Sequence, residues 1–338
     1  MTWIKDIHFV LLMLITVAAA CLISVVCGHF LLPVLKKLKI GQTERDDGPQ
    51  SHLSKTGTPT MGGIMILAGI LVACLIFSVQ KREFLYVAIL TTLCYGAVGF
   101  WDDYIKVVKR RSLGLKAMQK IVLQLLFAFA IALYCYLSPR IGSELYVPFI
   151  KRYVDFKLFY IPLVMFVIIA TTNSVNLTDG LDGLASSVSI VVMIMMAIVT
   201  QILTAKCLNP DTAMNMRNMI VFSSCVAGAC AGFLYYNHYP AKVFMGDTGS
   251  MALGGAFVIV AILTKTVLII PFLGLMFMVS SVSDIIQVAS YKLRNKKRVF
   301  LMAPLHHHFE KKGYSEVSIT IGYVIVTVIM AVVTWLII

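Results

Sequence analysis

The chain has 338 residues, of which 59% are hydrophobic and only 13% are charged, about half the charged fraction of a soluble protein. This composition excludes an ordinary soluble enzyme and predicts a protein that crosses a membrane several times. The net charge of +13 does not predict nucleic-acid binding, because excess Lys and Arg in a membrane protein mark loops held in the cytoplasm. The eight cysteines form no Cys-x-x-Cys pair, so we expect small buried side chains and neither a zinc site nor a disulfide framework.

Ten apolar segments are long enough, or nearly so, to cross a bilayer, which takes about 20 residues of helix. The weakest boundary is at Lys265, since residues 251–282 are too long for one span and a lone Lys suits the tip of a hairpin. The sequence therefore predicts an all-α polytopic membrane protein with about ten transmembrane helices in a single integral membrane domain, residues 1–338. The segments are residues 8–33, 62–79, 84–101, 121–138, 158–173, 185–204, 219–236, 250–264, 267–290 and 317–338.

The basic residues predict the orientation of these spans. Ten spans place both termini on one side, and roughly two thirds of the Lys and Arg lie in the loops that follow the odd-numbered spans. Because such loops stay in the cytoplasm, we expect both termini to be external. The polar motifs of the chain also fall in these five loops, so the sequence predicts one composite active site at the cytoplasmic face.

The first two of these loops contain a glycine-rich run and a pair of acids. Residues 57–63 read Gly-Thr-Pro-Thr-Met-Gly-Gly, but no strand-helix unit surrounds them, so they are not a dinucleotide fingerprint. Asp102 and Asp103 end the third span. Adjacent helical residues point about 100° apart, so we expect one to act as a base or metal ligand and the other to orient a Lys. The alternative is an acidic helix end at the membrane interface.

The third loop is the most polar stretch between two apolar segments. It carries the carboxylates Asp179 and Asp182 and the amides Asn173 and Asn176, with no Lys or Arg nearby. Ionisable groups beside membrane-length apolar runs are costly and usually functional. The alternative is a polar turn between two helices.

The fourth loop ends in a Gly-Asp-Thr-Gly turn just before an apolar segment. Its carboxylate, Asp247, is well placed for Mg²⁺, which binds one or two carboxylates together with phosphate oxygens. The helix start that follows could attract phosphate as well. A helix cap by Asp247 or Thr248 is the alternative, and it is compatible with metal binding.

The fifth loop contains three consecutive histidines, residues 306–308, and a basic run, residues 292–298. Consecutive residues do not have the spacing of a zinc site, so we expect hydrogen bonding or acid–base chemistry near phosphate. The alternative is an interfacial basic loop, and the basic run itself is expected to meet anionic lipid headgroups. The acids and lysines of all five loops together predict a diphosphate-and-magnesium site.

These motifs resemble those of the polyprenyl-phosphate N-acetylhexosamine-1-phosphate transferases. The paired aspartates, the run at 176–183 and the Gly-Asp turn are similar across that superfamily, while residues 57–63 and 304–310 are similar to its phospho-N-acetylmuramoyl-pentapeptide transferase branch. The resemblance implies transfer of phospho-MurNAc-pentapeptide from UDP-MurNAc-pentapeptide to undecaprenyl phosphate, giving lipid I and UMP, with Mg²⁺ as cofactor. It also implies a multi-pass protein of the bacterial inner membrane, in contact with membrane lipid, and a homodimer.

The resemblance further implies roles for individual residues. The catalytic residues would be Asp102, Asp103, Asp247, His306, His307 and His308, with Asp247 binding the metal. The substrate-binding residues would be Lys55, Thr60, Lys106, Lys120, Asn176, Asp179, Gly180, Leu181, Asp182, Asn237, Phe244 and Gly246. Phe244 could stack on uracil.

Two other functions are considered. A sister enzyme would use UDP-GlcNAc with the same lipid, and the two branch motifs disfavour it. An ion-coupled transporter also places acids in membrane helices, but its site lies near the midplane between inverted repeats. Here the acids gather at one face and no repeat is evident.

Overall fold

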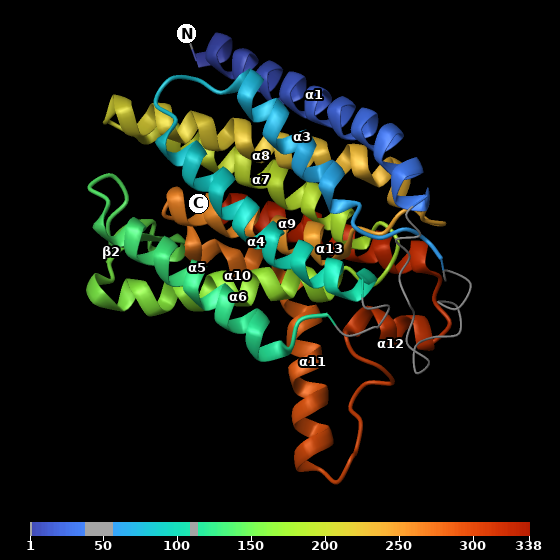
Figure 1. The fold of residues 1–338 in the computed structure, drawn as a ribbon. Coiled ribbons are helices and arrows are strands. Elements are labelled where there is room, and N and C mark those ends of the chain that lie inside the picture. Colours follow the sequence, from blue (N-terminus) through green and yellow to red (C-terminus); the bar gives the residue numbers. More distant parts are fainter. Residues whose placement is uncertain (1, 38–56, 109–113) are drawn as a thin grey trace.

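The computed structural model describes residues 2–37, 57–108 and 114–338 and is almost entirely helical (Figure 1). The helices are α1 (Thr2–Lys37), α3 (Gly63–Phe77), α4 (Glu83–Val108), α5 (Ala117–Leu137), α6 (Tyr160–Thr178), α7 (Leu184–Lys206), α8 (Pro210–Asn237), α9 (Gly246–Leu263), α10 (Ile270–Leu273), α11 (Leu275–Leu293), α12 (Leu305–Lys311) and α13 (Glu316–Ile337). Each of the ten apolar segments is mostly helical, and the turn at Lys265 separates α9 from the next helical segment, as predicted.

The number of full-length spans is smaller than ten. Eight helices in the described part of the chain are long and apolar enough to cross a membrane, and the pair of α10 and α11 makes a ninth if it is counted as one bent span. This pair bends by 79° at Gly274, the residue with the weakest helix propensity after proline. α3 is apolar but has only 15 residues. We therefore find a helical protein with eight or nine candidate spans.

α8 and α9 form the centre of the bundle. Their most apolar stretches are 83% and 89% buried inside the protein, against 17% for α1 and 22% for α13. α8 and α9 are also less apolar than these two outer helices, with mean hydropathy of 1.6 each against 2.9 for α1 and 2.4 for α13, as expected when neighbouring helices and not lipid surround them. α1 and α7 pack on α8, and α4 and α6 pack on α9. The loop from α8 to α9, which leads to Asp247, is thereby held between the two most enclosed helices.

The end of the bundle away from α12 carries a small hairpin. β1 (Glu144–Val147) pairs antiparallel with β2 (Arg152–Asp155), a feature that the all-α prediction missed because each strand has only four residues. The Tyr146 hydroxyl donates to the main-chain oxygen of Ile338 over 2.8 Å, which brings the end of α13 to this hairpin. The start of α1 lies toward the same end (Figure 1). The two ends of the described chain thus lie toward one end of the bundle.

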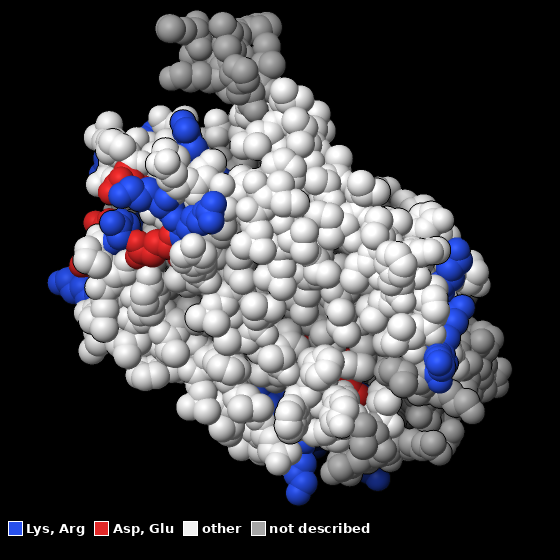
Figure 2. Space-filling view, turned by 45° about the horizontal axis from the view of Figure 1, so that its top comes forward, with Lys and Arg blue, Asp and Glu red and all other residues white. Residues whose placement is uncertain are grey.

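The surface between the two ends of the bundle is poor in charge. Figure 2 shows a broad uncharged area on one face, with most charged side chains toward its edges. Large apolar side chains are exposed on the outer helices, among them Leu22 and Phe30 of α1, Phe166 of α6 and Trp335 of α13. Exposed apolar surface of this extent is what a lipid-facing protein requires.

α11 leaves the bundle as an arm (Figure 1). One polar stripe of α11 holds the segment that returns to α12. The Gln287 amide oxygen accepts from the main-chain N–H groups of Val299 and Phe300, both at 3.0 Å. The Ser290 hydroxyl donates to the Lys297 oxygen over 2.9 Å, and the Ser283 hydroxyl accepts from Leu305, also at 2.9 Å. The arm therefore fixes where α12 and its histidines lie.

Candidate active site

Three aspartates meet at the end of the bundle that carries α12. Asp102 and Asp103 come from the last turns of α4, and Asp247 comes from the first turn of α9. One carboxylate oxygen from each lies within 4.8 Å of the other two. The structure thus joins the acids of the second and fourth loops into one cluster.

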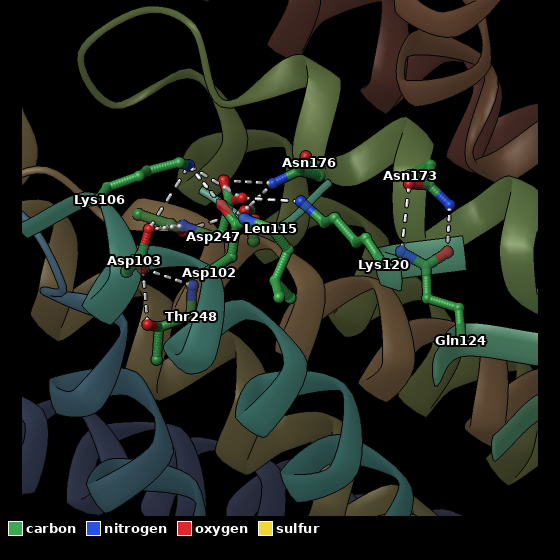
Figure 3. Close-up of polar contacts among 12 residues, drawn as sticks. Asp102, Asp103, Lys106, Leu115, Lys120, Gln124, Asn173, Asn176, Asp247 and Thr248 are labelled. Carbon is green, nitrogen blue, oxygen red and sulfur yellow. Dashed lines mark hydrogen bonds and ion pairs between the residues drawn. The ribbon is translucent and has the colours of Figure 1, made fainter. Parts of the chain in front are cut away.

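Two lysines neutralise this cluster (Figure 3). The Lys106 ammonium lies 2.7 Å from Asp102 Oδ2 and 3.1 Å from Asp247 Oδ2. The Lys120 ammonium, from the start of α5, lies 2.7 Å from the same oxygen of Asp247. Asp102 Oδ1 also accepts from the main-chain N–H of Leu115 over 2.9 Å. Asp102 therefore contacts a Lys, and which of the two adjacent acids acts as a base or metal ligand stays a prediction.

α6 adds a layer of amides behind Asp247 (Figure 3). Asn176 donates to Asp247 Oδ1 over 2.9 Å and to the Ser250 hydroxyl over 2.8 Å. One turn deeper, Asn173 donates to the Gln124 side-chain oxygen over 2.6 Å. Gln124 follows Lys120 by four residues on α5, so both side chains lie on one face of that helix. This face meets the face of α6 that carries Asn173 and Asn176. The sequence analysis missed Gln124, although a glutamine inside an apolar span is the signal that could have found it.

Asp103 also lies near Lys106, with 3.9 Å between its Oδ1 and the ammonium, but its hydrogen bonds go to the start of α9. Its Oδ1 accepts from the main-chain N–H of Asp247 over 3.1 Å. Its Oδ2 accepts from the main-chain N–H of Thr248 over 2.9 Å and from the Thr248 hydroxyl over 2.7 Å. Glycine makes this approach possible, because a Cβ at Gly99 would lie 2.0 Å from the Asp247 carbonyl oxygen. A Cβ at Gly246, whose φ is +73°, would lie 2.5 Å from Asp103 Oδ2.

The glycine-rich first loop supports the same turn. Phe244 donates its main-chain N–H to Pro59 over 2.8 Å, and Gly62 and Gly63 donate to Phe244 and Met245 over 2.9 Å. Thr60 is buried within this pairing and Phe244 is half-buried. The segment therefore anchors the residues that lead into Asp247, which the sequence did not predict. Lys55 lies outside the described residues.

The third loop lies beside the cluster and is itself densely bonded. Burial, and then the negative charges of Asp247, Asp103 and Asp182, raise the pKa of Asp179 to about 8. Asp182 accepts from the main-chain N–H of Ala241 over 2.9 Å. Thus Asp182 ties the third loop to the fourth.

Asn237 makes a second tie between these loops. It accepts from Gly183 N–H over 3.0 Å and donates to the Val243 oxygen over 2.9 Å. Neighbouring Leu181 is buried. In this structure Asn237 and Asp182 bind main-chain groups, so their roles toward substrate stay predictions.

The three histidines of α12 have three different surroundings. His306 is fully buried, and a Cβ at Gly180 would lie 2.3 Å from its Nε2, so α12 packs directly on the third loop. His307 Nδ1 lies 3.0 Å from a Glu310 oxygen, while His308 Nδ1 accepts from Leu301 N–H over 3.1 Å. Among the described residues no histidine joins a group that could hold a metal ion.

The aspartate cluster fits a metal ion by its chemistry. Its donors are all carboxylate oxygens, which suit Mg²⁺ better than softer metals. The two ammonium groups on Asp247 show that the cluster binds positive charge.

Comparisons with known proteins agree on one family. The sequence profile of the protein family described as glycosyl transferase family 4 matches residues 85–265 of this chain. Three similar proteins are phospho-N-acetylmuramoyl-pentapeptide transferases. The one from Caldanaerobacter subterraneus is 46% identical over 91% of this chain and 92% of its own length. Those from Clostridioides difficile and Clostridium novyi are 45% and 43% identical, over 94% and 96% of both chains respectively. These matches favour the muramoyl-pentapeptide branch over the sister enzyme and the transporter. The chain therefore belongs to the phospho-N-acetylmuramoyl-pentapeptide transferases of glycosyl transferase family 4.

Proposed function

We propose that this chain transfers phospho-MurNAc-pentapeptide from UDP-MurNAc-pentapeptide to undecaprenyl phosphate, forming lipid I and releasing UMP. As a multi-pass bacterial protein of this family, it resides in the cytoplasmic membrane. The observation that carries the proposal is the cluster of Asp102, Asp103 and Asp247 with Lys106 and Lys120, at one end of an apolar bundle. A lipid phosphate and a soluble nucleotide could both reach such a site.

The charges of the cluster suit a reaction between two phosphates. A Mg²⁺ ion held by Asp247 would supply electrostatic stabilisation of the diphosphate oxygens. Lys106 and Lys120 now bind Asp247 and would turn to phosphate oxygens when substrate enters. Asn176 keeps one oxygen of Asp247 in place during this exchange.

We infer that the lipid phosphate attacks directly. Its oxygen forms a bond to the sugar-linked phosphorus, the bond from that phosphorus to UMP breaks, and UMP leaves with the electron pair. A phosphate monoester has a second pKa of about 6, so it is mostly dianionic at neutral pH and needs little help from a base. Positioning and charge neutralisation then supply most of the rate.

The nucleotide subsite is assigned to the loops around the cluster. We infer that the third and fourth loops bind it through Asp179, Gly180, Leu181 and Phe244, with Phe244 stacking on uracil. α12 lies directly over Gly180, which supports a place for the histidines beside the diphosphate. Lys55, Thr60, Asp182, Asn237 and Gly246 complete this proposed set.

The proposed orientation puts the aspartate cluster in the cytoplasm. The excess of Lys and Arg in the loops at that end supports it, and the ends of α1 and α13 would then be external. We further infer one membrane domain, with all ten helical segments crossing or entering the bilayer, and a homodimer. Impermeant labelling of single cysteines in a cysteine-free background tests the orientation. Positions 116 and 311 should react only from the cytoplasm and position 151 only from outside; labelling of 311 from outside would overturn it.

The reaction itself is tested by release of UMP from the purified protein in detergent. UMP should appear only when UDP-MurNAc-pentapeptide, undecaprenyl phosphate and Mg²⁺ are all present, and lipid I should form in equal amount. UDP-GlcNAc in place of the first substrate should give no product. Equal turnover of UDP-GlcNAc would contradict the proposed substrate and favour the sister reaction.

A further inference from the structure

We propose that Asp103 is a positioning residue, which fixes the first turn of α9 and thereby places the Asp247 carboxylate toward the reacting groups. This inference rests on the proposed function and distinguishes Asp103 from the adjacent Asp102. The sequence cannot separate them, because both are acids at the same helix end. Their hydrogen bonds do separate them.

Both oxygens of Asp103 are occupied by the start of α9. They accept three hydrogen bonds from Asp247 and Thr248, at 2.7 to 3.1 Å, and the side chain is only 3% exposed. A carboxylate held by two main-chain N–H groups and a hydroxyl has little capacity left for an incoming phosphate. By contrast, the side chain of Asp247 is 18% exposed and contacts both lysines.

α9 needs such a partner because it has no cap of its own. The first N–H groups of any helix lack partners within it and require an external acceptor. α8 and α13 solve this locally, since Asn209 and Ser315 accept from the N–H groups that follow them. The corresponding residue of α9 is Met245, whose side chain makes no such bond. Asp103 supplies the acceptor from α4, and its negative charge also suits a helix N-terminus.

The chain is shaped for this contact. Gly246 has the positive φ of +73° and no Cβ, and any Cβ there would collide with Asp103 Oδ2 at 2.5 Å. Gly99, one turn before Asp103 on α4, allows the two helices to touch at the Asp247 carbonyl. The position of the Asp247 carboxylate thus depends on Asp103 through the backbone, without a bond between the two side chains.

Hydrogen exchange in the metal-free, full-length protein tests the proposal without substrate. Asp103→Ala should speed exchange of the 247 and 248 amides by about tenfold or more, since each hydrogen bond to a charged group contributes at least about 1.5 kcal/mol. Asp247→Asn, the matched control, should leave these amides protected because the Asp103 bonds remain. Mn²⁺ binding, followed by electron paramagnetic resonance, should weaken about tenfold in Asp103→Ala and more strongly in Asp247→Asn.

A second variant covers failure of Asp103→Ala to fold. Thr248→Val removes only the hydroxyl donor and should weaken Mn²⁺ binding by roughly two- to fivefold, in the same direction. Unchanged exchange and unchanged Mn²⁺ affinity in the Asp103 variant, together with lost UMP release, would overturn the proposal and give Asp103 a chemical role. Unchanged Mn²⁺ affinity in Thr248→Val would likewise count against it. Failure of the proposed reaction would instead appear as absent turnover in the unmutated protein.

Discussion

The two ends of α9 each carry a carboxylate–lysine pair, and their surroundings differ. At the start of the helix, the Asp247 and Lys120 side chains are 2.7 Å apart and 18% and 17% exposed. Just beyond its end, Lys265 lies 3.2 Å from Glu144 of the hairpin, and that carboxylate is 57% exposed. The first pair belongs to a network with Lys106, Asp102 and Asn176. The second stands on the surface beside a tyrosine ring.

The enclosed pair is stable only with further hydrogen bonds from its surroundings, whereas the exposed pair needs none. Enclosing charge beside apolar helices is costly, and the attraction between two partners recovers the cost only when further hydrogen bonds satisfy both. At the start of α9 three other helices, α4, α5 and α6, supply partners to the Asp247 carboxylate. The exposed pair loses little water and contributes little stability. The comparison therefore assigns function to one end of α9 and not to the other.

The largest effect is expected from removing the charge of Asp247. Asp247→Asn should lower the rate of UMP release by roughly 10²-fold or more, since a charged group at a phosphoryl-transfer site stabilises the transition state by several kcal/mol. The rate is measured at saturating Mg²⁺, and thermal unfolding in detergent shows that the variant is folded. Near-normal turnover would leave Asp247 only a structural role at the helix start.

A smaller effect is expected from the amide pair behind the cluster. Gln124→Leu should cost about 1–3 kcal/mol of stability, because it leaves the Asn173 amide with one partner fewer in an apolar setting. It should also slow UMP release by about tenfold or less, since Lys120 lies one turn away on the same face of α5. Both quantities follow from thermal unfolding and initial rates.

The double variant is the control for that pair. Replacing both amides, as Gln124→Leu with Asn173→Leu, should recover most of the stability, because no polar group is then left without its partner. A double variant less stable than the sum of the single ones would show that the two amides do not act as a pair.

A pH effect follows from Asp179, whose pKa is raised to about 8. An acid whose pKa is higher in the folded protein binds more protons folded than unfolded. Stability is thus lost as pH rises from its ordinary value, about 3.9, through 8. In metal-free protein, Tm should fall between about pH 6 and pH 9 more steeply than in Asp179→Asn, which carries no titrating group. If Tm fell equally steeply with pH in both proteins, the pKa of Asp179 would not be raised by burial and the neighbouring aspartates.

The sequence predicts which acids matter better than how they divide the work. Asp102, Asp103 and Asp247 stand out because acids at the ends of apolar segments are rare and costly. The separate role of Asp103 depends on which acid of an adjacent pair faces α9, and that is decided by the packing of α4 on α9. A glutamine inside an apolar span marks Gln124 as unusual, but its pairing with Asn173, and that of Ser250 with Asn176, exists only once the fold brings α5, α6 and α9 together.

The same limit applies to the fold. Apolar length locates all ten helical segments, because hydropathy along the chain is a local property. Hydropathy does not show the 79° bend at Gly274, because the segments on both sides of it pass together as one apolar run. The hairpin escapes prediction because its strands are short and one of them is exposed on both faces.

The smallest effect is expected at the exposed end of α9. Like Asp247→Asn, Glu144→Gln replaces a carboxylate by an amide and so breaks an ion pair with a lysine, here Lys265. Water already solvates this carboxylate, so the change in stability should be at most about 1 kcal/mol and should shrink further in high salt. UMP release should stay within about twofold of the unmutated rate, because the hairpin lies at the opposite end of the bundle from the aspartate cluster. Thermal unfolding at low and high salt, with the rate assay beside it, measures both. A tenfold loss of activity in Glu144→Gln would mean that charge at the hairpin is coupled through α9 to Asp247, and that the two ends of this helix do not act independently.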